Sequence, residues 1–355
     1  MRENSYTSSS DRRKTVRKSN IICFIKILMV IIIAVPVFFY YGGVYKKAAD
    51  KNVINAFTKQ RFDDFYALEE NSLDMVFVGS SHAYCTFDPD IIDKGLNIKS
   101  FQMGTPLQHP DTTYYELKEI LRTQKPKYVV MELYWDVLDD KFDLKQANSF
   151  FEVLKSNDIK EEYIKKVFPL SDKLKYYLLP IRYQQDYFAY EGSLMEKDME
   201  EKYGVSKRQA ETQQGEEYYR SKGYVYSNQL MVSTEYDSTN QFRNFDGKDF
   251  EIDKTQRKYI EKISELCREN GITLVFVTAP VANVSMEYIK NYENVHNSVA
   301  AMAAENGVPY IDYNVENIKK GLLTNENFRD DAHLNHSGVE IVDYSFIEWF
   351  RENIL

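Results

Sequence analysis

The fold of this chain is constrained most by a series of short segments that are apolar almost throughout. Helical segments separate them. The runs Met75–Val78 and Tyr128–Leu133 have the length of strands and no alternating polar side. A weaker run, Ile98–Met103, lies between them, and Ile272–Val277 and Val308–Ile311 follow later. Strands that are apolar on both sides are typical of a parallel sheet covered by helices on both faces. We therefore predict an α/β fold with three layers and a flavodoxin-like parallel sheet.

Helix signals fall between these strands. Asp111 and Asp253 are predicted N-caps, and Gly271 is a predicted C-cap. The expected helices cover residues 111–123, 253–271, 285–305 and 337–353. In open sheets of this kind, the functional site lies at the carboxyl ends of the strands.

The stretch from about 140 to 250 interrupts this alternation. It is rich in Lys, Glu, Gln and Tyr, and it lacks the apolar runs of buried strands. We interpret it as a largely helical insertion. A lid, a glycan platform, a partner surface and a solvated elaboration of the scaffold are all open interpretations of it.

The segment Ile21–Val44 is strongly apolar, interrupted mainly by Lys26 and Pro36. About 20 apolar residues in a helix cross a bilayer, so we predict a retained transmembrane anchor. The alternative is a cleaved signal peptide, but the apolar core is long for one and no small-x-small cleavage site is evident.

The charges around this segment predict its orientation. Six of the first 25 residues are basic and two are acidic, which favours a cytoplasmic N-terminus. The predicted location is the cell membrane, with a single pass and an extracytoplasmic main domain. The predicted divisions are a basic tail over 1–20, a transmembrane helix over 21–45, a stalk or packing element over 46–70, and the main domain over 71–355.

The composition excludes several classes of function. A net charge of -9 argues against a nucleic-acid partner, which would need a basic face. The three cysteines, Cys23, Cys85 and Cys267, form no Cys/His cluster with zinc spacing. We expect no metal and no cofactor.

Two short motifs carry the chemistry. Ser81 follows the first predicted strand at a turn, where a serine is well placed to be an exposed nucleophile. Near the other end, Asp330 precedes His333 by three residues. A serine needs a base to become a nucleophile, and the base needs a third group to orient it, so these residues form a candidate triad.

The segments Phe77–His82 and Asp330–Asn335 resemble the first and last blocks of the SGNH (GDSL-like) hydrolase superfamily, with Ser80 where that family usually has Asp. The resemblance covers roughly residues 72–136 and 253–355. It is closest to membrane-anchored relatives that act in teichoic-acid D-alanylation and alginate O-acetylation. It implies an SGNH-like fold and acyl-transfer chemistry.

The resemblance also implies roles for single residues. Ser81 is the expected nucleophile, and its backbone N–H contributes to the oxyanion hole. Gly104 resembles the glycine of the second block, whose N–H is a further oxyanion donor. His333 is the expected general base, and Asp330 is expected to hold its imidazole in the correct tautomer.

The third block departs from the family pattern. The family has Gly-x-Asn there, whereas this chain has Glu132–Asp136 and no such Asn. One missing oxyanion donor costs roughly 3–4 kcal/mol of transition-state stabilisation. Asn283 is one substitute to consider.

Several residues have alternative interpretations. Ser80 is a second candidate nucleophile, His336 a second candidate base, and Asp331 a second candidate orienting acid. His82 directly follows Ser81 and is poorly placed to act as its base, so a structural role or a place at the edge of the substrate is expected. Trp135 is a candidate for stacking on a sugar ring, with core packing as the alternative.

The leading hypothesis is a membrane-anchored, extracytoplasmic esterase or O-acyltransferase that acts on a cell-surface glycan. Transfer would involve a multi-pass membrane acyltransferase as partner. The alternative is a non-catalytic SGNH-fold module for binding or assembly in a complex that modifies the cell envelope. Serine, base and acid in register favour the enzyme.

Overall fold

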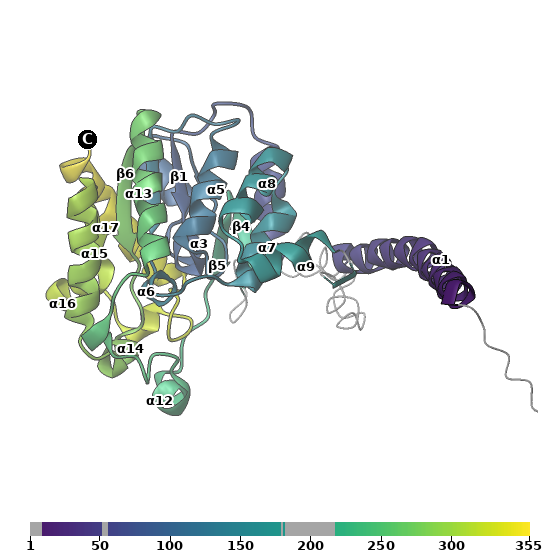
Figure 1. Ribbon diagram of the computed structural model, residues 1–355. Coiled ribbons are helices and arrows are strands. Elements are labelled where there is room, and N and C mark those ends of the chain that lie inside the picture. The colour runs from purple at the N-terminus through teal and green to yellow at the C-terminus, as the bar shows by residue number, and fades with distance from the viewer. Residues whose placement is uncertain (1–8, 52–55, 179, 182–216) are drawn as a thin grey trace, which may run out of the picture. The chain divides into compact units, whose positions relative to one another are not determined.

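The computed structural model of the chain describes residues 9–51, 56–178, 180–181 and 217–355 (Figure 1). The chain divides into two compact units. One contains Met1–Val53 and Leu170–Met195, and the other contains Ile54–Pro169 and Glu196–Leu355. The first unit includes α1 (Ser9–Lys51) and α9 (Leu170–Tyr177).

Helix α1 contains the predicted membrane span. Over Arg17–Val44 it is long and apolar enough to cross a membrane, and the large apolar side chains of this stretch are exposed. Pro36 lies within the helix. A membrane anchor and an N-terminal signal sequence share these properties, so α1 is a candidate for either.

The second unit is built on a five-stranded sheet in which all neighbouring strands are parallel, in the order β2-β1-β3-β6-β7. This order is the flavodoxin-like one, so the predicted fold class is confirmed. The strands are β1 (Met75–Val78), β2 (Ser100–Gln102), β3 (Tyr128–Glu132), β6 (Thr273–Thr278) and β7 (Tyr310–Asp312).

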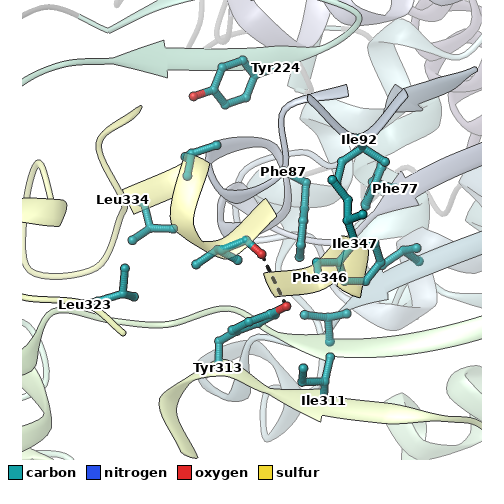
Figure 2. Packing of buried hydrophobic residues seen from close by; sticks show 14 of the residues in the cluster. Phe77, Phe87, Ile92, Tyr224, Ile311, Tyr313, Leu323, Leu334, Phe346 and Ile347 are labelled. Atoms are coloured by element: carbon teal, nitrogen blue, oxygen red, sulfur yellow. Dashed lines mark hydrogen bonds between the residues drawn. The ribbon is translucent and has the colours of Figure 1, made fainter. Parts of the chain in front are cut away.

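One face of this sheet is covered by α4 (Pro89–Leu96) and α17 (His336–Asn353). Figure 2 shows the packing there, where Phe77 of β1 stacks on Phe87 with ring centroids 5.0 Å apart and contacts Phe346 of α17. Leu334 belongs to the same buried cluster. The segment that precedes α17 is therefore anchored in the core.

The other face carries α5 (Pro110–Ile120), α13 (Lys254–Glu269) and α15 (Tyr292–Asn306). Helices α5 and α13 lie side by side in front of the sheet (Figure 1). Side chains of a strand alternate between the faces, and both sets are buried, which explains the continuous apolar runs of the sequence. The other short helices are α2 (Ala56–Tyr66), α3 (Ser81–Thr86), α6 (Trp135–Leu138), α12 (Tyr236–Thr239), α14 (Asn283–Tyr288) and α16 (Tyr313–Lys320).

Two local predictions are corrected. The N-cap of α5 is His109 and not Asp111, because the fixed φ of Pro110 suits the first helical position and the helix therefore begins there, which places Asp111 within the first turn. The helix expected over 285–305 is divided into α14 and α15 by residues in a non-helical conformation, including Asn291 with φ 53°.

The insertion between β3 and β6 is only partly helical. Its described helices include α7 (Leu144–Val153) and α8 (Asn157–Lys166), and residues 182–216 lie outside the described part of the chain. It also contains an antiparallel hairpin of β4 (Glu217–Ser221) and β5 (Tyr224–Ser227), which the prediction of a largely helical insertion missed. All four residues of β5 are buried, so no alternating pattern marked the strand.

The turn of this hairpin is seated against the edge of the sheet. Lys222 O accepts a hydrogen bond from Gln102 N of β2 at 2.9 Å, and Gly223 O accepts two from the buried guanidinium of Arg61. Gly223 has φ 84°, and a Cβ there would lie 2.1 Å from Gln102 O. The turn therefore needs glycine for its conformation and for its close approach.

We expect Gly223→Ala to destabilise the protein by about 3 kcal/mol, because it adds a backbone clash to a strained φ. Gly271→Ala is the matched control. Gly271 also has a positive φ, but a Cβ there meets nothing within 4 Å, so we expect a cost of about 1 kcal/mol. Thermal unfolding of the full chain measures both, and equal losses would contradict the proposed seating of the hairpin.

Candidate active site

Strand β1 delivers Ser81 to the carboxyl edge of the sheet. Gly79 has φ 134°, and a Cβ there would lie 2.8 Å from both Cβ and O of Glu132, so only glycine fits the turn. Ser80 then caps α3 by accepting a hydrogen bond from His82 N at 3.1 Å. Ser81 is the first residue of that helix and is partly exposed.

The structure brings the imidazole of His333 to this serine. Nε2 of His333 lies 2.9 Å from Ser81 Oγ, across 252 residues of sequence. Nδ1 lies 3.1 Å from each carboxylate oxygen of Asp330. This is the geometry of a nucleophile, a base and an orienting acid.

Asp330 is held as a carboxylate in a fixed orientation. Its Oδ1 accepts hydrogen bonds from the backbone N–H groups of Ala332 and His333, at 2.8 and 2.7 Å. Burial raises the pKa of Asp330, but His333, Arg329 and the Ala332 N–H outweigh it and hold that pKa below its ordinary value. The acid therefore stays ionised and favours a proton on Nδ1 of the imidazole.

Arg329 is a site residue that the sequence reasoning missed. Its Nε lies 3.4 Å from Asp330 Oδ2, and its Nη1 lies 2.7 Å from Glu217 Oε2 of β4. Its side chain is almost completely buried, and Nη2 donates to the thiol sulfur of Cys85 on α3. A cation directly before the Asp-x-x-His motif was the available signal.

Gly104 lies close against the turn that carries the serine. A Cβ at Gly104 would lie 2.8 Å from Ser80 O and 2.9 Å from Gly79 O. The N–H groups on either side are used, since Met103 N donates to Phe77 O and Thr105 N to Gly79 O. Within the described part of the chain, the N–H groups of Gly104 and Ser81 have no acceptor. Both are available to an oxyanion.

Glu132 occupies the position where the resemblance led us to look for an amide. Its Oε2 accepts from Ser80 N at 2.9 Å and from Ser80 Oγ at 2.7 Å. Its Oε1 is buried and has no hydrogen-bond partner among the described residues. Burial raises the pKa of Glu132 to about 7, against the opposing effect of the Ser80 hydrogen bonds. Glu132 thus fixes the turn before the nucleophile.

The structure does not bring Trp135 or Asn283 to the triad. Trp135 is 1% exposed and packs against Phe242 and Tyr292, which is the core role weighed as its alternative. Asn283 donates to Leu323 O and accepts from Asn317, so its amide is engaged in α14 packing. Neither has a described contact with Ser81 or His333.

The residues considered as alternatives for the triad, His336, Asp331 and Ser80, have other partners. Nδ1 of His336 lies 3.1 Å from Tyr224 Oη in the hairpin. Asp331 accepts from both N and Nε2 of Gln241, each at 2.7 Å. Ser80 points to Glu132. In contrast, His82 lies at the site, buried and stacked on the His333 ring with centroids 4.8 Å apart.

No group of three or more His, Cys, Asp or Glu side chains is arranged to hold a metal ion in the described ranges. The polar groups at the site are the triad, Arg329, Glu132 and the two backbone donors. This set suits the attack of a serine on a carbonyl carbon, with charge developing on the carbonyl oxygen.

Comparisons with known proteins place these residues in context. A family model described as "Protein of unknown function (DUF1574)" matches residues 26–337. No curated protein matches the chain. The matched range includes both Ser81 and His333.

Similar solved structures include a GDSL-like lipase from Bacteroides thetaiotaomicron VPI-5482, at 11% identity and a TM-score of 0.38, over 84% of this chain and 99% of that one. An acetyl xylan esterase is 10% identical with a TM-score of 0.35, over 79% and 99% of the two chains. A mutant of an acetyl-xylooligosaccharide esterase from Geobacillus is 10% identical with a TM-score of 0.33, over 81% and 96%.

The buried Glu132 predicts a pH dependence of stability. Its folded pKa of about 7 exceeds the ordinary 4.5, so the folded state binds more protons between these values, and stability falls as the pH rises through them. Glu132→Gln removes this contribution. We expect the unfolding free energy of wild type relative to the variant to fall by up to about 3 kcal/mol from pH 4.5 to 7. Denaturation of both proteins across this range measures it, and a constant difference would refute the assignment.

Proposed function

The chain belongs to the DUF1574 family, whose description assigns no activity, and from its site we propose that it is a serine esterase or O-acyltransferase. Ser81 is the nucleophile, His333 the general base and Asp330 the orienting acid. The observation that carries this proposal is the 2.9 Å approach of His333 Nε2 to Ser81 Oγ, with Nδ1 facing Asp330. An ordinary surface serine would not require a histidine at hydrogen-bond distance with a carboxylate oriented behind it.

The proposed reaction has two halves. Ser81 Oγ attacks the acyl carbonyl carbon while its proton passes to His333 Nε2. The protonated imidazole then gives that proton to the leaving alcohol oxygen as the ester C–O bond breaks, which leaves an acyl-enzyme. Water or a second hydroxyl, deprotonated by His333, attacks the acyl carbon and releases the serine. Water makes the protein an esterase, and a hydroxyl makes it a transferase.

Two backbone donors support the tetrahedral intermediate in this proposal. The N–H groups of Ser81 and Gly104 stabilise the oxyanion, and each such donor contributes roughly 3–4 kcal/mol. Glu132, the last residue of β3, supplies a carboxyl group engaged with Ser80, in place of a third amide donor. A site with two donors favours activated esters or a substrate whose remote groups contribute binding energy.

We further propose that α1 anchors the protein in the cell membrane, with the basic N-terminus inside and the main domain outside. The apolar span and the excess of basic residues before it support this orientation. An acyl ester on a cell-surface glycan is then the proposed substrate. Acyl groups for transfer must cross the bilayer, so a multi-pass membrane acyltransferase is the proposed partner for that reaction. The chemistry uses side chains and backbone donors alone and requires no cofactor.

Fluorophosphonate labelling of the full chain in detergent tests the mechanism. We expect wild type to be labelled, Ser81→Ala not to be labelled, and His333→Ala to react at least about 10⁴-fold more slowly, because the serine then lacks its base. Labelling that persists in Ser81→Ala would assign the nucleophile elsewhere. A folded wild type that resists labelling would instead favour the non-catalytic binding module.

The adjacent acids provide a matched pair of variants. We expect Asp330→Asn to lower the turnover of p-nitrophenyl acetate by about 10⁴-fold, because the amide no longer selects the active tautomer. Asp331→Asn changes a carboxylate that contacts Gln241, so we expect turnover within about tenfold of wild type. Similar losses in both variants would contradict the assignment of Asp330.

A further inference from the structure

We propose that His82 is a positioning residue for the general base, holding the plane of the His333 imidazole by stacking on its face. The inference rests on the proposed function, since it assigns His82 a part in the work of that triad. It also gives a reason for an imidazole directly after the nucleophile.

The ring of His82 packs against two other rings. Its centroid lies 4.2 Å from that of Tyr134, with the planes at 32°, and 4.8 Å from that of His333, with the planes at 27°. The three rings come from the end of β3, from α3 and from the segment before α17. His82 is 3% exposed, and its backbone N donates to Ser80 Oγ. Its ring nitrogens have no hydrogen bond among the described residues, so packing alone orients it.

The hydrogen bonds of His333 leave one motion unrestrained. Asp330 and Ser81 contact the two nitrogens of the ring. Such contacts fix the position of the ring along the line between the two partners, but the ring can still tilt about that line. A flat neighbour on the face of the ring opposes this tilt. His82 supplies that surface and is itself packed against Tyr134.

The charges around His82 suit this role. The groups facing it are His333, Asp330 and Arg329 from the segment before α17, and Tyr134 from the end of β3. Burial, and then the neighbouring His333, hold the pKa of His82 well below its ordinary value. When His333 becomes an imidazolium in the reaction, it therefore faces a neutral ring and not a second cation.

Two substitutions distinguish the effect of a flat aromatic ring at position 82 from the effect of side-chain volume alone. His82→Leu fills the space without an aromatic face, and His82→Phe restores the face. We expect His82→Leu to lower kcat for p-nitrophenyl acetate about three- to tenfold with KM within twofold, the size of an aromatic pair interaction. We expect His82→Phe to stay within twofold of wild type. Equal kcat in wild type and His82→Leu, or equal losses in both variants, would overturn the proposal.

His336→Leu is the matched control, because it also replaces an imidazole by leucine but at a position outside the proposed triad. His336 stacks on Tyr226 with centroids 4.7 Å apart and contacts the hairpin, with no described contact with Ser81 or His333. We expect its kcat to stay within twofold of wild type. Thermal unfolding of all three variants verifies that each is folded under the assay conditions.

A spectroscopic measurement tests the inference independently of turnover. The chain has five histidines, so the N–H signals of a ¹⁵N-histidine-labelled full chain in detergent are few. We expect the downfield Nδ1–H signal of His333, bonded to Asp330, in wild type and His82→Phe, and its broadening or loss in His82→Leu. A wild type that lacks turnover refutes the proposed function. An unchanged signal in His82→Leu refutes the positioning role, whatever the turnover.

Discussion

The parallel pairing of β1 with both β2 and β3 is the constraint on which the site depends. Phe77 is in register with Gln102, and Val78 with Met131, so the three strands end at the same edge. Their next residues therefore meet. Gly79 lies against Glu132, and Gly104 lies against the carbonyls of Gly79 and Ser80. A side chain on either glycine would separate the strands that bring the serine and its backbone donors together.

The insertion is coupled to the segment that carries the proposed base, although it interrupts the sheet in sequence. Glu217 forms an ion pair with Arg329, and Gln241 binds Asp331 through two hydrogen bonds. Between these contacts, Met231 N donates to Phe328 O at 2.9 Å. The residues on both sides of Asp330 are thus held by the insertion, which is not part of the five-stranded sheet or of the helices that cover it. The position of His333, the proposed base, depends on the insertion as well as on the core.

Local patterns in the sequence were sufficient to locate the five strands of the parallel sheet and the two motifs. Met75–Val78 was predicted with its observed bounds because a central parallel strand is apolar on both faces. The hairpin was not predicted, because β5 is buried throughout and its tyrosines do not alternate with polar residues. The contacts of Arg329 with Cys85 and of Glu132 with Ser80 span 244 and 52 residues. No local pattern encodes such contacts, so they emerged only with the fold.

The pKa values of two carboxyl groups near the proposed nucleophile are shifted in opposite directions, because the surroundings of the two groups differ. Asp330 faces a guanidinium, an imidazole and backbone N–H groups, which together keep it ionised. Glu132 is more deeply buried and receives only the two hydrogen bonds of Ser80, so burial dominates and its pKa rises to about 7. Near neutral pH the negative charge of the site therefore lies mainly on Asp330, next to Nδ1 of His333. In the proposed reaction an imidazolium formed at Nε2 is stabilised from Nδ1, while burial raises the pKa of the Glu132 carboxyl group and so favours its neutral form. Less repulsion then opposes the charge that develops on the carbonyl oxygen.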